Sequence, residues 1–158
     1  MITRAVKLVE DNAISSAVRT ISMERAGLAA LETALTNGLS EPFCKAIETI
    51  GQSNGRLIIT GVGKSGHIGA KLAATFASTG TPAFFVHAAE ANHGDLGMIG
   101  GDDVVLAISK GGESAELRSI INYSRRFSIP LIALTCSEAS SLAKASDIVL
   151  LVPNEQEA

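Results

Sequence analysis

A glycine-rich stretch, GVGKSGHIG at residues 61–69, holds residue types that proteins use to bind phosphate. It contains G-x-G-x-x-G, the pattern of dinucleotide-binding turns, and G-K-S, which ends a P-loop. The P-loop interpretation fails because it needs a glycine at the position of Ile58, within an apolar run. The dinucleotide interpretation lacks an acid at the end of the second expected strand, because Glu90 comes three residues after His87.

Both motifs bind phosphate with backbone N–H groups of a glycine turn, and residues 61–69 can offer the same groups. A glycine turn at a helix N-terminus offers N–H groups and the positive end of the helix dipole to an anion. Lys64 adds a positive charge and Ser65 adds a hydroxyl donor beside Gly63. The alternative is a tight turn with a solvent-facing lysine. The residue types favour a phosphate-bearing ligand.

A serine-containing loop follows the third apolar run. Its sequence, AISKGGESAEL, puts Ser109 at the end of the expected strand and Ser114 where the next helix starts. Ser114 could also cap that helix, and the two roles are compatible. The loop therefore joins the glycine turn as a second candidate phosphate contact.

The loop HAAEANHGDLGM, after the second run, gathers acidic and imidazole side chains, among them Glu90, His93 and Asp95. Histidine is well suited to proton transfer near neutral pH, because its ordinary pKa is about 6.5. Two alternatives remain open: His87, Glu90 and His93 as metal ligands without a standard spacing, and His93 as a loop hydrogen-bonding residue.

Composition narrows the class of protein. The chain has 158 residues, 46% of them hydrophobic, a net charge of −3 and a pI near 5.6. We therefore expect a globular protein with neither nucleic-acid nor membrane partners. Cys44 and Cys136 form no C-x-x-C motif and are expected to be reduced. Because there is no signal-peptide pattern and no apolar run of about 20 residues, we expect a cytoplasmic location.

Two N-terminal helices are expected to precede the sheet. The first, over residues 11–35, carries an apolar stripe at a seven-residue spacing, formed by Ile14, Ile21, Leu28 and Leu35 and widened by Val18 and Leu31. The second follows Ser40, with Pro42 in its first turn. Either both helices cover the sheet, or the stripe of the first also contacts another subunit.

Five short apolar runs follow residue 55: RLIIT, AFFVH, DVVLAIS, PLIALT and DIVLLV. Continuous runs of this kind are typical of parallel strands buried on both faces. Helical patterns over residues 67–78, 115–127 and 138–145 separate most of them. This alternation predicts a doubly wound α/β fold, whose ligands bind at the carboxyl ends of the strands.

The segments GVGKSGHIGAKLAATFASTGTPAFFVHAAEANHGDLGMI, DDVVLAISKGGESAEL, IPLIALT and ASDIVLLVPNEQEA resemble the sugar isomerase (SIS) domain of arabinose-5-phosphate isomerases. The resemblance covers about two thirds of the chain, and G-x-G-K-S-G-H and H-G-D-L-G-M occur together. It implies residues 1–54 as a helical segment on the sheet and on other subunits, and residues 55–158 as a SIS domain with a flavodoxin-like five-stranded parallel sheet.

The resemblance also implies homotetramers that interconvert ribulose 5-phosphate and arabinose 5-phosphate, in the synthesis of Kdo for lipopolysaccharide or of capsules. The reaction passes through a cis-enediolate and needs neither metal nor cofactor, because the carbonyl acidifies the proton. Candidate catalytic residues carried over from the family are Lys64, His93, Glu116 and Glu157. Candidate substrate and phosphate contacts are Gly63, Ser65, Ser109, Lys110 and Ser114.

The chain departs from the family pattern in two places. The third loop reads S-K-G-G-E-S instead of S-N-S-G-E-[ST], so Lys110 replaces asparagine and Gly111 lacks a hydroxyl. The family's C-P-L-G segment, its later histidine and its CBS domains are not in the sequence, so we expect a truncated and poorly active SIS domain. A non-catalytic sugar-phosphate-binding or regulatory SIS domain is the alternative function.

Overall fold

A parallel sheet of five strands forms the centre of the computed structural model, which describes residues 2–155 and the side chains from residue 12 onward. The strands are β1 (Leu57–Gly61), β2 (Ala83–His87), β3 (Val104–Ile108), β4 (Leu131–Thr135) and β5 (Ile148–Leu151). Their order in the sheet is β2-β1-β3-β4-β5. The expected α/β fold, including its parallel five-stranded sheet, is confirmed.

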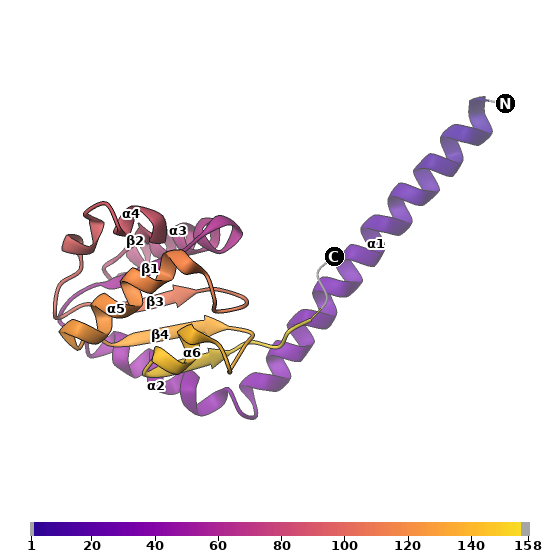
Figure 1. Ribbon diagram of the computed structural model, residues 1–158. Coiled ribbons are helices and arrows are strands. Elements are labelled where there is room, and N and C mark those ends of the chain that lie inside the picture. The colour runs from indigo at the N-terminus through magenta and orange to yellow at the C-terminus, as the bar shows by residue number, and fades with distance from the viewer. Residues whose placement is uncertain (1, 156–158) are drawn as a thin grey trace.

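Helices flank the sheet on both faces (Figure 1). The helices of the chain are α1 (Ile2–Leu35), α2 (Ser40–Gly51), α3 (Gly63–Ser78), α4 (Ala88–Ala91), α5 (Arg118–Phe127) and α6 (Ser141–Ala145), with short 3₁₀ turns η1 (Asp95–Met98) and η2 (Ala115–Leu117), and all of the α-helices except α1 lie against the sheet. Several begin elsewhere than the apolar pattern predicts. The helix expected from residue 67 begins at Gly63, since glycine, lysine and serine at its start carry no periodic signal.

The core has two halves, because successive side chains of a strand point to opposite faces of the sheet. On one face Ile58 and its neighbours pack with α4, α5 and α6, where Ile120 and Leu142 are fully buried. On the other face Ile59 packs with α2 and α3 through Ala46 and Ala73. The middle strands β1 and β3 are buried throughout, as the continuous apolar runs predict.

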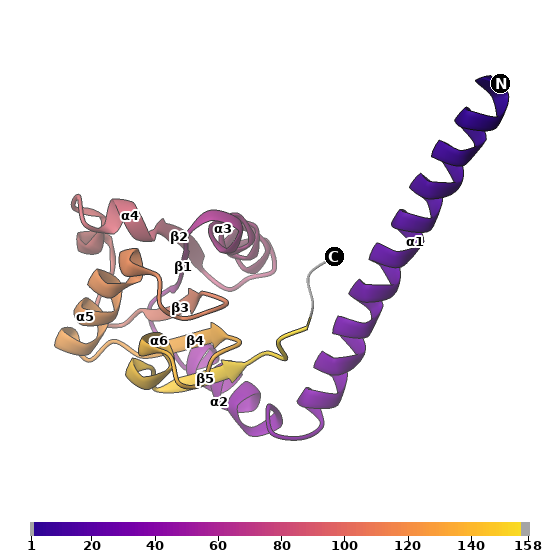
Figure 2. The same ribbon diagram turned by 45° about the vertical axis from the view of Figure 1, so that its right-hand side comes forward.

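The first helix does not cover the sheet. Helix α1 begins at Ile2, well before residue 11, and extends away from the domain in both views (Figures 1 and 2). The stripe is open to solvent, with Ile14, Ile21 and Leu28 64%, 67% and 68% exposed. Of the two N-terminal helices, α2 packs on the sheet through Ala46, while the apolar stripe of α1 is exposed in this single chain. Among the described residues, no helix is long and apolar enough to cross a membrane.

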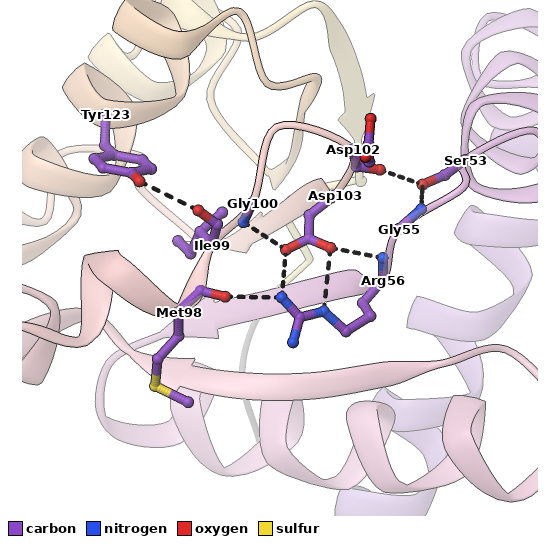
Figure 3. Close-up of polar contacts among 9 residues, drawn as sticks. All are labelled: Ser53, Gly55, Arg56, Met98, Ile99, Gly100, Asp102, Asp103 and Tyr123. Carbon is purple, nitrogen blue, oxygen red and sulfur yellow. Dashed lines mark hydrogen bonds and ion pairs between the residues drawn. The ribbon is translucent and has the colours of Figure 1, made fainter.

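An ion pair between Arg56 and Asp103, the residues directly before β1 and β3, holds together the amino ends of these strands, here called the amino edge of the sheet (Figure 3). Asp103, which is 3% exposed, accepts hydrogen bonds from Arg56 Nη2 at 2.9 Å, from the Arg56 N–H at 2.7 Å and from the Gly100 N–H at 2.8 Å. Arg56 also donates to the Met98 carbonyl at 2.8 Å and lies over the Phe84 ring. This network fixes the starts of strands whose other ends carry the candidate site.

Candidate functional site

Strand register brings the predicted loops together at the carboxyl edge of the sheet. Gly61 at the end of β1 is paired with His87 at the end of β2. Thr60 pairs with Ala107, so Gly61 lies beside the end of β3. Because β3 and β4 are also in parallel register, the chain leaves these strands at one edge. Ligands of open α/β sheets bind at this edge.

The glycine turn brings the start of α3 against the end of β3. A Cβ at Gly61 would lie 3.0 Å from the Ser65 carbonyl carbon and 3.1 Å from the Ile108 carbonyl oxygen, so a larger residue would push these backbone segments apart. Gly63, with a φ of 55°, begins the helix. The first N–H groups of a helix lack intrahelical acceptors, and here they start beside the serine loop. Lys64 is exposed and Ser65 is half-buried.

The serine loop after β3 brings two hydroxyls into contact. Ser109, only 5% exposed, accepts a hydrogen bond from the Gly112 N–H at 3.1 Å. Its Oγ lies 3.2 Å from the Ser114 Oγ. Ser114 precedes η2 but makes no side-chain capping bond, so the alternative role as an N-cap is not the one adopted. The predicted pair of phosphate contacts is therefore adjacent.

Lys110 and Gly111, the two positions that depart from the family pattern, lie on the exposed part of this loop. The Lys110 carbonyl accepts hydrogen bonds from the Thr135 Oγ1 at 3.0 Å and from the Cys136 N–H at 2.9 Å. These bonds tie the loop to the end of β4. The end of β4 therefore helps to set the backbone position of residue 110.

The predicted acid–base residues lie on a different flank of the same edge. His93 is exposed between α4 and η1, and Glu116 is exposed on η2. Asn92 and Ser119 are hydrogen-bonded through their side chains, which joins the end of α4 to the start of α5. Lys64 belongs to α3, on the opposite face of the sheet, so any ligand they share must span the edge. Glu157 lies outside the described residues.

Three residues that the sequence interpretation did not single out support the serine loop. Thr135, which is 2% exposed, holds the Lys110 carbonyl, and Glu113 accepts two hydrogen bonds from Ser141. A polar residue at the end of an apolar strand was the one sequence signal for Thr135. The hydrogen bonds that join Thr135 to Lys110 and Ser141 to Glu113 connect residues up to 28 positions apart, so they depend on the register of β3 and β4.

His87, considered above as a metal ligand, has a structural contact. Its Nδ1 accepts a hydrogen bond from the Ala89 N–H at 3.3 Å, at the start of α4. Among residues 12–155, whose side chains are described, no group of three or more His, Cys, Asp or Glu residues could hold a metal ion.

A hollow lies near the amino ends of β4 and β5, at the opposite ends of the strands from this site. It has a volume of about 320 Å³, and its charged lining residues are Lys45, Arg125 and Asp147. Arg125 pairs with Asp147 at 2.8 Å. Burial acts to raise the pKa of Asp147, but hydrogen bonds from Arg125 and the Leu131 N–H lower it below the ordinary value. Arg125 and Asp147 are paired with each other there, whereas the candidate serine and lysine donors lie at the carboxyl edge.

The chain is similar to curated proteins over most of its own length. The chain is 50% identical over 138 residues to the Yersinia pestis arabinose 5-phosphate isomerase KdsD, covering 87% of this chain and 41% of that protein. It is 48% identical over 145 residues to the Pseudomonas aeruginosa KdsD, covering 92% of this chain and 43% of that protein. The chain thus spans less than half the length of these curated relatives.

The chain is also similar to proteins of solved structure. The structure of E. coli CFT073 c3406 in complex with A5P is 43% identical, has a TM-score of 0.79, and is covered over 76% of its length by 90% of this chain. A Listeria monocytogenes crystal structure, 29% identical, gives a TM-score of 0.86, with 92% of this chain and 74% of that one covered. The family model of the SIS domain matches residues 50–158. The chain belongs to the SIS domain family.

Proposed function

We propose that the carboxyl edge of this sheet binds a phosphorylated pentose and interconverts arabinose 5-phosphate and ribulose 5-phosphate. The observation that carries the proposal is the pair of hydroxyls of Ser109 and Ser114, 3.2 Å apart, in the loop after β3. The Ile108 carbonyl at the end of that strand would lie 3.1 Å from a Cβ at Gly61, in the turn that leads into α3. Hydroxyls, a helix N-terminus and a lysine together suit a phosphate group. The identity of 48–50% to the two KdsD isomerases supports the choice of substrate.

The proposed chemistry moves a proton between C1 and C2 of the sugar through a cis-enediolate. One group must take the carbon-bound proton and return it, and another must move protons between the oxygens. His93 and Glu116 are proposed for proton handling because both are exposed on the α4–η2 flank. Lys64 would stabilise the developing oxyanion from the side of α3. Glu157 remains a further candidate.

The wider role is part of the same proposal. It includes a homotetramer, a place in the synthesis of Kdo or capsular sugars, and a cytoplasmic location. Cys44 and Cys136 are both unpaired, as is usual in compartments that keep thiols reduced. The exposed stripe of α1 offers a surface for assembly.

Ligand-induced stabilisation tests the binding step. A ligand that binds only the native state raises its stability by RT ln(1 + [L]/Kd). The melting temperature should therefore rise with arabinose 5-phosphate and stay unchanged with NAD or ATP. Conversion of arabinose 5-phosphate to ribulose 5-phosphate is then measured directly. Binding without conversion would favour the alternative of a sugar-phosphate-binding regulatory domain. Equal stabilisation by NAD or ATP, or none by the sugar phosphate, would contradict the proposal.

A further inference from the structure

The serine loop is held in place by the segment that follows β4. The Lys110 carbonyl accepts from the Cys136 N–H at 2.9 Å, and the Gly112 carbonyl accepts from the Leu142 N–H at 3.1 Å. These contacts fix the loop from Lys110 to Gly112. Ser114 lies two residues beyond Gly112, with Glu113 between them.

Glu113 supplies the contact next to Ser114. Its Oε1 accepts a hydrogen bond from the Ser141 N–H at 2.7 Å, and its Oε2 accepts one from the Ser141 hydroxyl at 2.8 Å. Hydrogen bonds to an ionised carboxylate are short and stronger than neutral ones. The Ser141 hydroxyl and N–H also hold the pKa of Glu113 below its ordinary value, which keeps the carboxylate ionised.

Packing around this part of the loop is incomplete. A cavity of about 170 Å³ lies against Ser114 and is also lined by Glu113, Arg118 and Ser141. A backbone segment with few packing contacts opens at low free-energy cost unless hydrogen bonds hold it. On its far side Ser114 is held by the Leu117 N–H, which donates to the Ser114 carbonyl at 3.1 Å, and it makes no side-chain capping bond to η2. On its near side the adjacent contact is that of Glu113 with Ser141.

We propose that Glu113 is a positioning residue for substrate phosphate. By binding both donors of Ser141, it holds the Ser114 hydroxyl within reach of Ser109, so that the two hydroxyls act together on one phosphate. This inference rests on the proposed function. Glu113 itself does not donate to the phosphate, because an ionised carboxylate is only an acceptor.

The sign of the effect separates positioning from simple electrostatics. Removing a negative charge near an anion-binding loop should strengthen phosphate binding if charge alone matters. Loss of positioning should weaken it. Glu113→Ala is therefore expected to raise the Kd for arabinose 5-phosphate and for inorganic phosphate by a similar factor, roughly tenfold for the loss of charge-assisted hydrogen bonds. Glu113→Gln keeps one carbonyl acceptor and should recover part of the affinity.

Matched variants complete the experiment. Glu138→Ala removes an exposed carboxylate from the neighbouring loop and should leave affinity unchanged or slightly higher. Ser141→Ala should weaken binding like Glu113→Gln, and the double variant Glu113→Ala/Ser141→Ala should bind no worse than Glu113→Ala alone. Affinities are measured by calorimetry well below each melting temperature. If Glu113→Ala does not fold, Glu113→Gln and Ser141→Ala test the proposal in its place: a rise in their Kd for arabinose 5-phosphate supports positioning, and an equal or lower Kd contradicts it.

The ways in which the experiment can fail are distinguishable. If the unchanged protein does not bind arabinose 5-phosphate, the proposed function is wrong and this inference falls with it. If the unchanged protein binds and the Glu113 variants bind equally well or more tightly, the proposed function stands and the positioning role is overturned. Additive effects of Glu113→Ala and Ser141→Ala would also overturn it, because the two residues would then act separately.

Discussion

The hydroxyl of Ser109 joins the core of the domain to its candidate site. It is almost fully buried, yet its Oγ accepts from the Gly112 N–H and faces the Ser114 Oγ. A buried hydroxyl without a partner is unfavourable, so its place at a strand end reflects these contacts. Because a hydroxyl can accept one hydrogen bond while donating another, Ser109 can shape the loop and still donate to a phosphate.

Ser109→Ala should therefore lower both affinity and stability. We expect the Kd for arabinose 5-phosphate to rise roughly tenfold, and the free energy of unfolding to fall by about 1–3 kcal/mol because the Gly112 N–H loses its acceptor. Calorimetry and urea denaturation measure the two effects. Ser78→Ala, which removes an exposed hydroxyl from the far end of α3, should change neither. Unchanged affinity in Ser109→Ala would remove Ser109 from the site.

Lys64→Ala should weaken sugar-phosphate binding and leave the fold intact. The side chain is exposed at the start of α3, where its charge adds to the positive end of the helix dipole. Lys71→Ala, further along the same helix, is the control for general charge. Melting temperature and affinity are compared for both variants. A large drop in melting temperature with unchanged affinity would show that Lys64 is structural.

At the scale of elements, the serine loop can approach the segment after β4 only with a glycine at residue 112. Gly112 has a φ of 68°, and a Cβ there would overlap the Ser140 hydroxyl. Gly112→Ala should lower the free energy of unfolding by about 1–3 kcal/mol and displace the serine loop. Gly111→Ala should be close to neutral, because a Cβ at residue 111 would meet no other atom within 4 Å. Equal losses in both variants, measured by urea denaturation, would contradict this account.

The ion pair at the amino edge predicts a pH dependence of stability. Burial acts to raise the pKa of Asp103, but hydrogen bonds from Arg56 and the Gly100 N–H outweigh it, and the pKa lies below its ordinary value. The stabilisation is therefore complete above the unfolded-state pKa near ~3.9 and is lost as pH falls through the lower native value. Asp103→Asn should flatten the acid limb of stability, measured by urea denaturation between about pH 2 and 6. An unchanged acid limb would show that Asp103 does not contribute.

The sequence predicts the elements of the sheet better than their contacts. Apolar runs locate all five strands, because burial on both faces leaves a continuous signal. The glycine turn and Ser109 follow from strand ends in the same way. Thr135 and the Glu113–Ser141 contact do not, since they depend on register between distant segments. The position of α1 was also hidden, because an apolar stripe indicates a buried face without saying which surface covers it.

At the scale of the whole molecule, α1 is a long helix whose apolar face is not covered by the other described residues of the chain. Its 34 residues span about 51 Å at 1.5 Å per residue. Helices gain most of their stability in proteins from packing of an apolar face, and here that face is exposed at Ile14, Val18, Ile21 and Leu28. Burial of such side chains is worth about 1.5–3 kcal/mol each. The stripe is consistent with the proposed assembly of several copies of the chain.

Ile21→Glu tests that assembly, because it places a charge in the middle of the stripe. If the stripe lies between subunits, the variant should shift to smaller species, since an unpaired buried charge disfavours association. Ser16→Glu adds the same charge on the opposite side of the helix, given about 100° per residue, and should keep the original mass. Light scattering coupled to size-exclusion chromatography measures both. A mass that stays the same in Ile21→Glu while stability falls would mean that the stripe packs within its own chain, and α1 would then fold back in solution.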